Sequence, residues 1–304
     1  MKTRKFILLF TMFVFVSVSS FAENAAYVIP SKVENVKQPF LLLNGTWQFK
    51  YSPTSKWTTI EAPGEAVMQG YAIEHDKPFW YRKVFTLPVD YKGKRVILRF
   101  DGVYSQARLL VNGKFVREHH GGFTRWETDV TEFVKPGGKN EIMLEVTDRL
   151  DEISYASGYA HHPIGGILRD VTIFALPQTH IFDFRIETRL DTLYKDAVLQ
   201  LSYLAEAANG AEIEYTLTDP DGKNVAIREN KFSLSNETGD IINKIPVSNP
   251  KKWDAEHPFL YTLTIVIHKD GKVLYNFSRK IGFRDIKIVR DRMLVNGIDR
   301  KSVV

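Results

Sequence analysis

Closely spaced carboxylates are the side chains of this sequence that could carry out acid–base or nucleophilic chemistry. Two such groups held side by side can share the roles of general acid, general base and nucleophile. Three sets lie close together along the chain: Glu61 with Glu65, Glu127 with Asp129, and Asp148 with Asp151 and Glu152. Each set falls in a turn or at the end of an expected strand, where acidic side chains are usually solvated or cap turns. We therefore assign no catalytic role to them.

Two histidine pairs, His119-His120 and His161-His162, are the candidate metal ligands, because imidazole is a common ligand. Adjacent residues of a strand point to opposite faces, so each pair would offer one ligand per face and no chelate. The sequence has no cysteine, and no cluster of carboxylates supports either pair. We therefore expect neither a metal site nor a cofactor.

Tryptophan rings are the third kind of candidate, since a flat apolar face that is partly open to water can stack on a sugar ring. Buried aromatic side chains more often build the cores of β-sandwiches. Trp47 and Trp80 lie in segments with alternating apolar residues and are predicted to be core residues. Trp57 and Trp126 are the candidates for stacking on a ligand.

The N-terminus has the composition of a secretory leader. Basic residues at positions 2, 4 and 5 precede an apolar run from Phe6 to Val16, and Ser20-Phe21-Ala22 has the small-x-small pattern of a cleavage site. The run is shorter than the roughly 20 residues that cross a bilayer. Residues 1–22 are therefore predicted to be a signal peptide, and the protein to be exported to a bacterial periplasm or beyond, with no membrane segment after cleavage.

Charge and composition exclude some classes of partner. Removing the predicted leader lowers the formal net charge from +5 to +2. No run of Lys and Arg interleaved with aromatic residues remains that could follow a phosphate backbone, so a nucleic acid is not expected as a partner. Without cysteine no disulfide can form. Stability must come from buried cores, which 44% hydrophobic residues can supply.

Apolar residues alternate at period two through most of the chain, as in Thr46–Tyr51 and Glu141–Val146, which predicts short strands. Asn112-Gly113, Asp221-Gly222 and Asp270-Gly271 each predict a β-hairpin. No window keeps the apolar spacing of a capped amphipathic helix. The predicted fold class is all-β, with packed antiparallel sheets.

A domain boundary is predicted at Leu176-Pro177-Gln178, since proline cannot donate to a ladder and suits a joint between sheets. Residues 23–178 then form a first β-sandwich. Residues 179–284, with about 100 residues and six or seven strand-like runs, have the length and spacing of an immunoglobulin-like β-sandwich. Residues 285–304 remain as a short C-terminal stub.

Short phrases in order along the chain carry a resemblance to a known family. In the first sandwich they are Leu43–Phe49 (LNGTWQF), Phe79–Phe85 (FWYRKVF), Arg99–Val103 (RFDGV), Val111–Lys114 (VNGK), His120–Phe123 (HGGF), Thr128–Thr131 (TDVT) and Gly165–Val171 (GGILRDV). In the second they are Trp253, His257–Leu263 (HPFLYTL) and Ile281–Arg284 (IGFR).

Together these phrases resemble glycoside hydrolase family 2, the family of β-galactosidases, β-glucuronidases and β-mannosidases. The first sandwich resembles the family's sugar-binding N-terminal domain, a galactose-binding-like jelly roll, and the second resembles its immunoglobulin-like domain. Any single phrase is weak, but eight or more in register over about 260 residues are specific.

The resemblance implies retaining glycoside hydrolysis by two glutamates that stand about 5 to 5.5 Å apart. In the family both glutamates belong to a (β/α)₈ barrel, which needs roughly 250 residues. Met293–Gly297 resembles the strand and turn before that barrel, and residues 285–304 can supply one strand at most. The resemblance therefore implies the N-terminal part of an exported enzyme, truncated before its barrel, with no catalytic residue of its own. The implied partners are the missing barrel and a β-linked carbohydrate.

The loop from Tyr155 to Pro163 precedes one of the family phrases, and in relatives this loop can lean toward the substrate pocket. His161 and His162 are for this reason candidates for contacts with sugar hydroxyls. The candidate substrate-binding residues are thus these two histidines with Trp57 and Trp126.

An alternative reading is a stand-alone periplasmic carbohydrate-binding protein built from the same two sandwiches. Soluble monomers rarely expose apolar patches above a few hundred Å². The alternative therefore predicts polar surfaces where a barrel would pack, whereas an accessory part of a larger enzyme should expose an apolar face.

Overall fold

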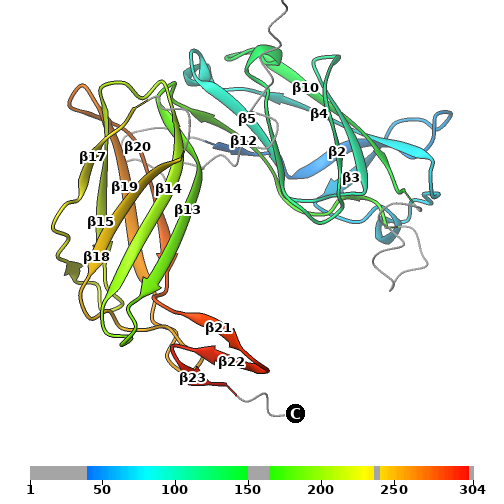
Figure 1. Cartoon of the computed structure of the whole chain (residues 1–304). Helices are drawn as coiled ribbons and strands as arrows, with labels where there is room; N and C mark the ends of the chain where they lie inside the picture. Colours follow the sequence, from blue (N-terminus) through cyan, green and yellow to red (C-terminus); the bar gives the residue numbers. More distant parts are fainter. Residues whose placement is uncertain (1–39, 150–163, 236–239, 301–304) are drawn as a thin grey trace, which may run out of the picture.

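The computed structural model describes residues 40–149, 164–235 and 240–300 (Figure 1). Strands dominate, and the helices in these ranges are single turns of 3₁₀ helix, η2 (Val67–Gln69), η3 (Val89–Tyr91) and η4 (Thr131–Phe133). In this part of the chain no helix is long and apolar enough to span a membrane. The predicted all-β class is confirmed, as a jelly-roll sandwich followed by an immunoglobulin-like sandwich.

The first sandwich packs a four-stranded sheet, in the order β1-β12-β5-β9, against a six-stranded sheet, in the order β3-β2-β4-β10-β7-β8. Two short strands, β6 and β11, pair beside them. Its strands are β1 (Phe40–Leu42), β2 (Gly45–Lys50), β3 (Thr58–Ala62), β4 (Pro78–Thr86), β5 (Arg95–Phe100), β6 (Val103–Tyr104), β7 (Gln106–Val111), β8 (Lys114–His120), β9 (Trp126–Asp129), β10 (Lys139–Thr147), β11 (Gly166–Ile167) and β12 (Val171–Leu176).

The second sandwich packs β13-β14-β18 against β16-β15-β19-β20, with β17 paired to β15. Alternating apolar residues of these strands form its core, as in β19, where every second side chain from Tyr261 to Ile267 is buried. Its strands are β13 (His180–Leu190), β14 (Ala197–Glu206), β15 (Ala211–Thr218), β16 (Asn224–Val225), β17 (Lys231–Ser233), β18 (Ile241–Val247), β19 (Tyr261–Lys269) and β20 (Lys272–Ile281).

The three predicted hairpins form. Asn112-Gly113 joins β7 to β8 and Asp270-Gly271 joins β19 to β20, with positive φ at all four residues, as a type I′ turn requires. The Asp221-Gly222 hairpin is longer. Asp219 caps it by accepting hydrogen bonds from the backbone N–H groups of Asp221 and Lys223, so Gly222 alone adopts positive φ there.

The outer face of the four-stranded sheet is covered where the sandwiches meet. Every residue of β12 is buried, because alternate side chains point to the first core and to the second sandwich. Ile97, Phe174 and Leu176 form a separate buried cluster, against which Phe40 and, from β13, Phe182 pack. We call these five side chains the junction cluster.

Polar contacts flank the junction cluster. Arg95 of β5 pairs with Asp129 of its own sandwich at 2.9 Å and with Glu206 of β14. Gln178 donates its side-chain amide to the carbonyl of Gly93 at 2.8 Å. The joint between the sandwiches is therefore both packed and hydrogen-bonded.

The C-terminal segment folds into three antiparallel strands, β21 (Ile286–Val289), β22 (Arg292–Val295) and β23 (Ile298–Asp299), below the second sandwich in Figure 1. The prediction of at most one strand in this segment is wrong. Two tight turns reverse the chain, with positive φ at Arg290 in the first and at Asn296 and Gly297 in the second. The turn at Asn296-Gly297 is expected from the sequence, whereas the reversal at Arg290 adds a strand that the length of the segment does not suggest.

Candidate functional site

Trp57 lies just before β3 and has 40% of its surface exposed. The guanidinium of Arg82 sits 5.9 Å from the ring centroid and is held in place by Glu141, which accepts from its Nε at 2.6 Å. The indole is therefore accessible and backed by a fixed cation. Of the two predicted stacking rings, this is the one that the structure leaves open to solvent.

Trp126 does not offer a stacking face. Only 4% of its surface is exposed, and its ring stacks on Phe100 at 4.5 Å and on His119 at 5.0 Å between centroids. Burial, followed by the nearby Arg117, lowers the pKa of His119 to about 4, so this imidazole packs in its neutral form. The proposal of a sugar-stacking ring at Trp126 is corrected, because the side chain belongs to the first core.

The other two tryptophans of the first sandwich differ from each other. Trp47 is a core residue as predicted, with 1% exposure and its indole N–H donated to the carbonyl of Leu43. Trp80 is not, because the alternation of β4 turns its neighbours Phe79 and Tyr81 inward and Trp80 outward. It lies half-buried on the outer face of the six-stranded sheet.

Two members of the acidic sets, Glu127 and Asp148, are more deeply buried than expected. Glu127 forms an ion pair with Arg99, and the two side chains are only 5% and 8% exposed. Asp148 is completely buried and lies 2.8 Å from Nδ1 of His75. The expectation of solvated surface charge is wrong for Glu127 and Asp148, since each carboxylate has a cationic or imidazole partner that permits burial. Glu61 is exposed and accepts from Thr46.

The histidines divide between described and undescribed parts of the chain. His119 and His120 point to opposite faces of β8, as predicted, with His119 against Trp126 and His120 hydrogen-bonded to Glu118 at 3.0 Å. His161 and His162, like Asp151 and Glu152, lie outside the described residues. Within residues 40–149, 164–235 and 240–300 no group of three His, Cys, Asp or Glu side chains could hold a metal ion.

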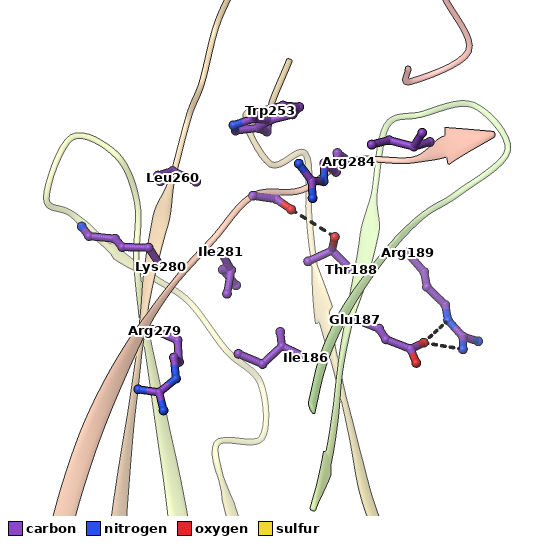
Figure 2. Close-up of a pocket in the computed structure, with 12 residues that line it drawn as sticks. Ile186, Glu187, Thr188, Arg189, Trp253, Leu260, Arg279, Lys280, Ile281 and Arg284 are labelled. Atoms are coloured by element: carbon purple, nitrogen blue, oxygen red, sulfur yellow. Dashed lines mark hydrogen bonds and ion pairs between the residues drawn. The ribbon is translucent and has the colours of Figure 1, made fainter. Parts of the chain in front are cut away.

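A cleft of about 580 Å³ lies between the edge strands of the two sheets of the second sandwich (Figure 2). Its walls are β13 and β20, the edge strands of the two sheets, and Thr188 bridges them by donating to the carbonyl of Gly282 at 3.1 Å. Its apolar lining residues are Ile186, Leu260, Ile281 and Ile286.

The cleft carries an excess of positive charge. Arg189 is paired with Glu187 at 2.7 Å, but Arg279, Lys280 and Arg284 have no carboxylate partner among the residues that the structure describes. Arg284 stacks on Trp253 at 4.6 Å, and Figure 2 shows the two together at one end of the cleft. Partial burial, followed by Arg99 and Arg125 from the first sandwich, lowers the pKa of Arg279. The arrangement suits contact with another macromolecular surface better than bond cleavage, since Glu187, already paired with Arg189, is the single carboxylate among the described residues that line it.

The C-terminal strands extend this cleft with an apolar surface. Ile286 pairs with Val295 and Ile288 with Met293, and Val295 pairs in turn with Ile298, so all five side chains share one face of the small sheet. Four of them are exposed, by 50% for Ile286, 80% for Ile288, 49% for Met293 and 61% for Ile298. We call these five residues the apolar face.

The small sheet is fixed to the second sandwich. Asn296 accepts from the backbone N–H of Asp285 at 2.9 Å and donates to the carbonyl of Trp253 at 3.1 Å. Arg300 pairs with Glu256 at 2.6 Å. The apolar face and the cleft therefore form one continuous surface joined at Ile286, which the sequence analysis did not identify.

Two family models match this chain. The one described as the sugar binding domain of glycosyl hydrolases family 2 matches residues 41–177, and the one described as glycosyl hydrolases family 2 matches residues 179–284. This chain belongs to glycosyl hydrolases family 2. Its resemblance to the family, carried by the short phrases in both sandwiches, is thereby confirmed.

Family 2 relatives have similar sequences. A β-galactosidase of Thermoanaerobacter pseudethanolicus is 30% identical over 266 residues, which cover 84% of this chain and 35% of the relative. A β-glucuronidase of Bacteroides fragilis is 28% identical over 265 residues, covering 80% of this chain and 37% of the relative. The chain thus spans about a third of the length of the curated relatives it matches.

Solved structures agree with this family 2 architecture. A putative β-galactosidase from Bacteroides fragilis matches with a TM-score of 0.74 and 25% identity, over 86% of this chain and 43% of that one. A β-glucuronidase from Ruminococcus gnavus, solved with D-glucuronic acid, shares the fold with a TM-score of 0.73 at 22% identity, over 90% of this chain and 50% of that one.

Proposed function

We propose that this chain is the N-terminal, non-catalytic part of an exported family 2 glycoside hydrolase. A catalytic (β/α)₈ barrel packs on the apolar face and the adjoining cleft, and the two sandwiches hold that barrel and shape the approach to its pocket. The two catalytic glutamates belong to the barrel, so this chain alone does not hydrolyse a glycoside. The substrate of the whole enzyme is a β-linked carbohydrate such as a β-galactoside or β-glucuronide.

The apolar face is the observation that carries the proposal. A three-stranded sheet with four exposed apolar side chains on one side has lost the partner that such a face normally packs against. The cleft next to it adds two edge strands and three cations without carboxylate partners. Together they give a surface suited to a second domain with apolar and acidic groups.

These features favour an accessory part over a stand-alone carbohydrate-binding protein. A self-sufficient module would present polar side chains on β21–β23, whereas Ile288, the most exposed of the four, has 80% of its surface open to solvent. Exposed apolar side chains gathered on one face mark protein contact surfaces.

Other parts of the proposal rest on the sequence. Residues 1–22 direct export as a signal peptide, residues 23–178 and 179–284 are the two accessory domains, and residues 285–304 begin the link to the barrel. Trp57 and the loop with His161 and His162 supply sugar contacts near the barrel's pocket.

Lysine substitutions on the apolar face test this proposal. The purified chain should bind the dye anilinonaphthalene sulfonate and self-associate with rising concentration, and Ile288→Lys with Ile298→Lys should reduce both signals at least twofold. Met68→Lys, at a side chain 82% exposed in η2 of the first sandwich, is the matched control and should change neither. Each variant should melt within a few degrees of the parent, because exposed substitutions change stability by about 0.5 kcal/mol or less. If the unsubstituted chain stays monomeric and does not bind the dye, the result would instead support the stand-alone carbohydrate-binding protein.

A further inference from the structure

A row of outward-facing polar and aromatic side chains crosses the six-stranded sheet of the first sandwich. The register of the sheet sets Lys50 opposite Trp80, Trp80 opposite Glu145, Glu145 opposite Arg108, and Arg108 opposite Glu118. Directly opposed residues lie on the same face of a sheet. The five side chains, which we call the polar row, therefore form one line over β2, β4, β10, β7 and β8.

The row is held in place by contacts between its members and their neighbours. Trp80 donates its indole N–H to Glu145 at 3.1 Å, and the ammonium of Lys50 lies 5.8 Å from the Trp80 ring centroid. Glu118 accepts from Gln106 and from His120. These hydrogen bonds, with Gln106 as the largest influence, lower the pKa of Glu118, so it is a carboxylate acceptor at neutral pH.

Arg108 is the member with unused hydrogen-bonding capacity. Its guanidinium lies 5.1 Å from the ring centroid of Phe115, and among the described residues it makes no ion pair or hydrogen bond. A guanidinium carries five N–H donors. Arg108 and Phe115 also line a groove of about 360 Å³, together with Gln106, Glu118, Glu145 and Thr147. The groove therefore combines free donors, oriented acceptors and an aromatic ring that is 49% exposed.

We propose that the polar row binds a neutral, extended β-linked oligosaccharide that lies across the strands. Strands are spaced by about 4.8 Å, close to the length of one sugar residue in an extended β-linked chain, so successive sugars meet successive members of the row. Two cations and two carboxylates balance within the row, which suits a ligand that is uncharged and rich in hydroxyl groups.

Each kind of group in the row has a task in this binding. Arg108 donates to hydroxyl oxygens, and the oriented carboxylates of Glu145 and Glu118 accept from hydroxyl hydrogens. The rings of Phe115 and Trp80 contact the apolar faces of sugar rings. The site lies on the outer face of the first sandwich and does not depend on a catalytic barrel, so it would tether the protein to a polysaccharide independently of hydrolysis.

Native gel electrophoresis of the purified chain in gels that contain a dissolved polysaccharide tests the proposal. Hydroxyethyl cellulose supplies an extended, neutral β-linked chain, soluble starch a coiled α-linked chain, and polygalacturonate an anionic chain. We expect hydroxyethyl cellulose to retard the protein and soluble starch not to. Arg108→Ala and Phe115→Ala should each weaken the retardation at least tenfold in apparent dissociation constant.

Matched controls separate the row from general surface effects. Arg228→Ala and Phe123→Ala remove an exposed cation and an exposed aromatic ring elsewhere and should leave the retardation unchanged. Thermal melting should confirm that every variant is folded. The proposal is overturned if hydroxyethyl cellulose does not retard the parent, if the row variants bind as the parent does, or if only polygalacturonate retards it, which would point to the cationic cleft.

Discussion

Replacing Arg99 with Met should lower the free energy of unfolding of the first sandwich by about 3–5 kcal/mol, the effect of breaking a buried ion pair by removing one partner. Arg99 and Glu127 sit on paired strands, β5 and β9, with side chains 8% and 5% exposed. Met keeps much of the volume of the side chain but removes the guanidinium that pairs with the buried Glu127 carboxylate. Urea unfolding followed by tryptophan fluorescence measures the change.

Two further variants isolate the charge. Arg99→Met combined with Glu127→Leu should recover most of the loss, because an apolar pair of similar volume often replaces a buried ion pair without cost. Arg125→Ala breaks the pair with Asp101, in which the arginine side chain is 59% exposed, and should cost only about 0–1 kcal/mol. If Arg99→Met and Arg125→Ala lowered the free energy of unfolding equally, burial would not make the Arg99–Glu127 pair more important for stability than an exposed pair.

Phe174→Ala should destabilise the junction by about 3–5 kcal/mol and separate the unfolding of the two sandwiches. Phe174 is completely buried in the junction cluster, with Ile97 beside it, Phe182 of β13 packed against the cluster and the guanidinium of Arg99 at 5.1 Å from its ring. Truncation leaves a cavity at the joint. Calorimetry should show two transitions in place of one, and small-angle scattering a larger radius of gyration.

The control for the junction is a truncation at an exposed position. Leu193→Ala, at a side chain 81% exposed, should leave both measurements unchanged. Because Phe174 touches Arg99, its loss and that of the ion pair should not be additive. A Phe174→Ala variant with one transition and an unchanged radius would mean that the sandwiches are not coupled through this cluster.

Local signals in the sequence predict the strands and hairpins well. Asn112-Gly113 and Asp270-Gly271 need positive φ values that few other residue pairs supply, so the turns follow from the residues themselves. The buried positions of Trp47 and of the apolar residues of β19 follow equally from period-two alternation. Phrases that combine such turns and strands identify the family.

The side of the strand on which a residue lies, and the contacts that the folded chain makes with it, explain what the sequence could not predict. Trp80 sits between two apolar neighbours, and only the direction of the pleat places it outside the core. Glu127 is buried because Arg99 pairs with it across strands, and Trp126 because Phe100 and His119 lie against it, and all three contacts join different strands. The apolar face depends on two reversals of the last strands, and the sequence indicates only the second of them, at Asn296-Gly297, while the first lies at Arg290.

The central claim is that the reaction centre lies outside this chain, and hydrolysis of 4-nitrophenyl β-galactoside and 4-nitrophenyl β-glucuronide tests it most directly. The purified chain should release no more nitrophenol than a mock preparation from cells without the gene. Nitrophenol release that follows the protein through successive purification steps and exceeds the mock would contradict the claim.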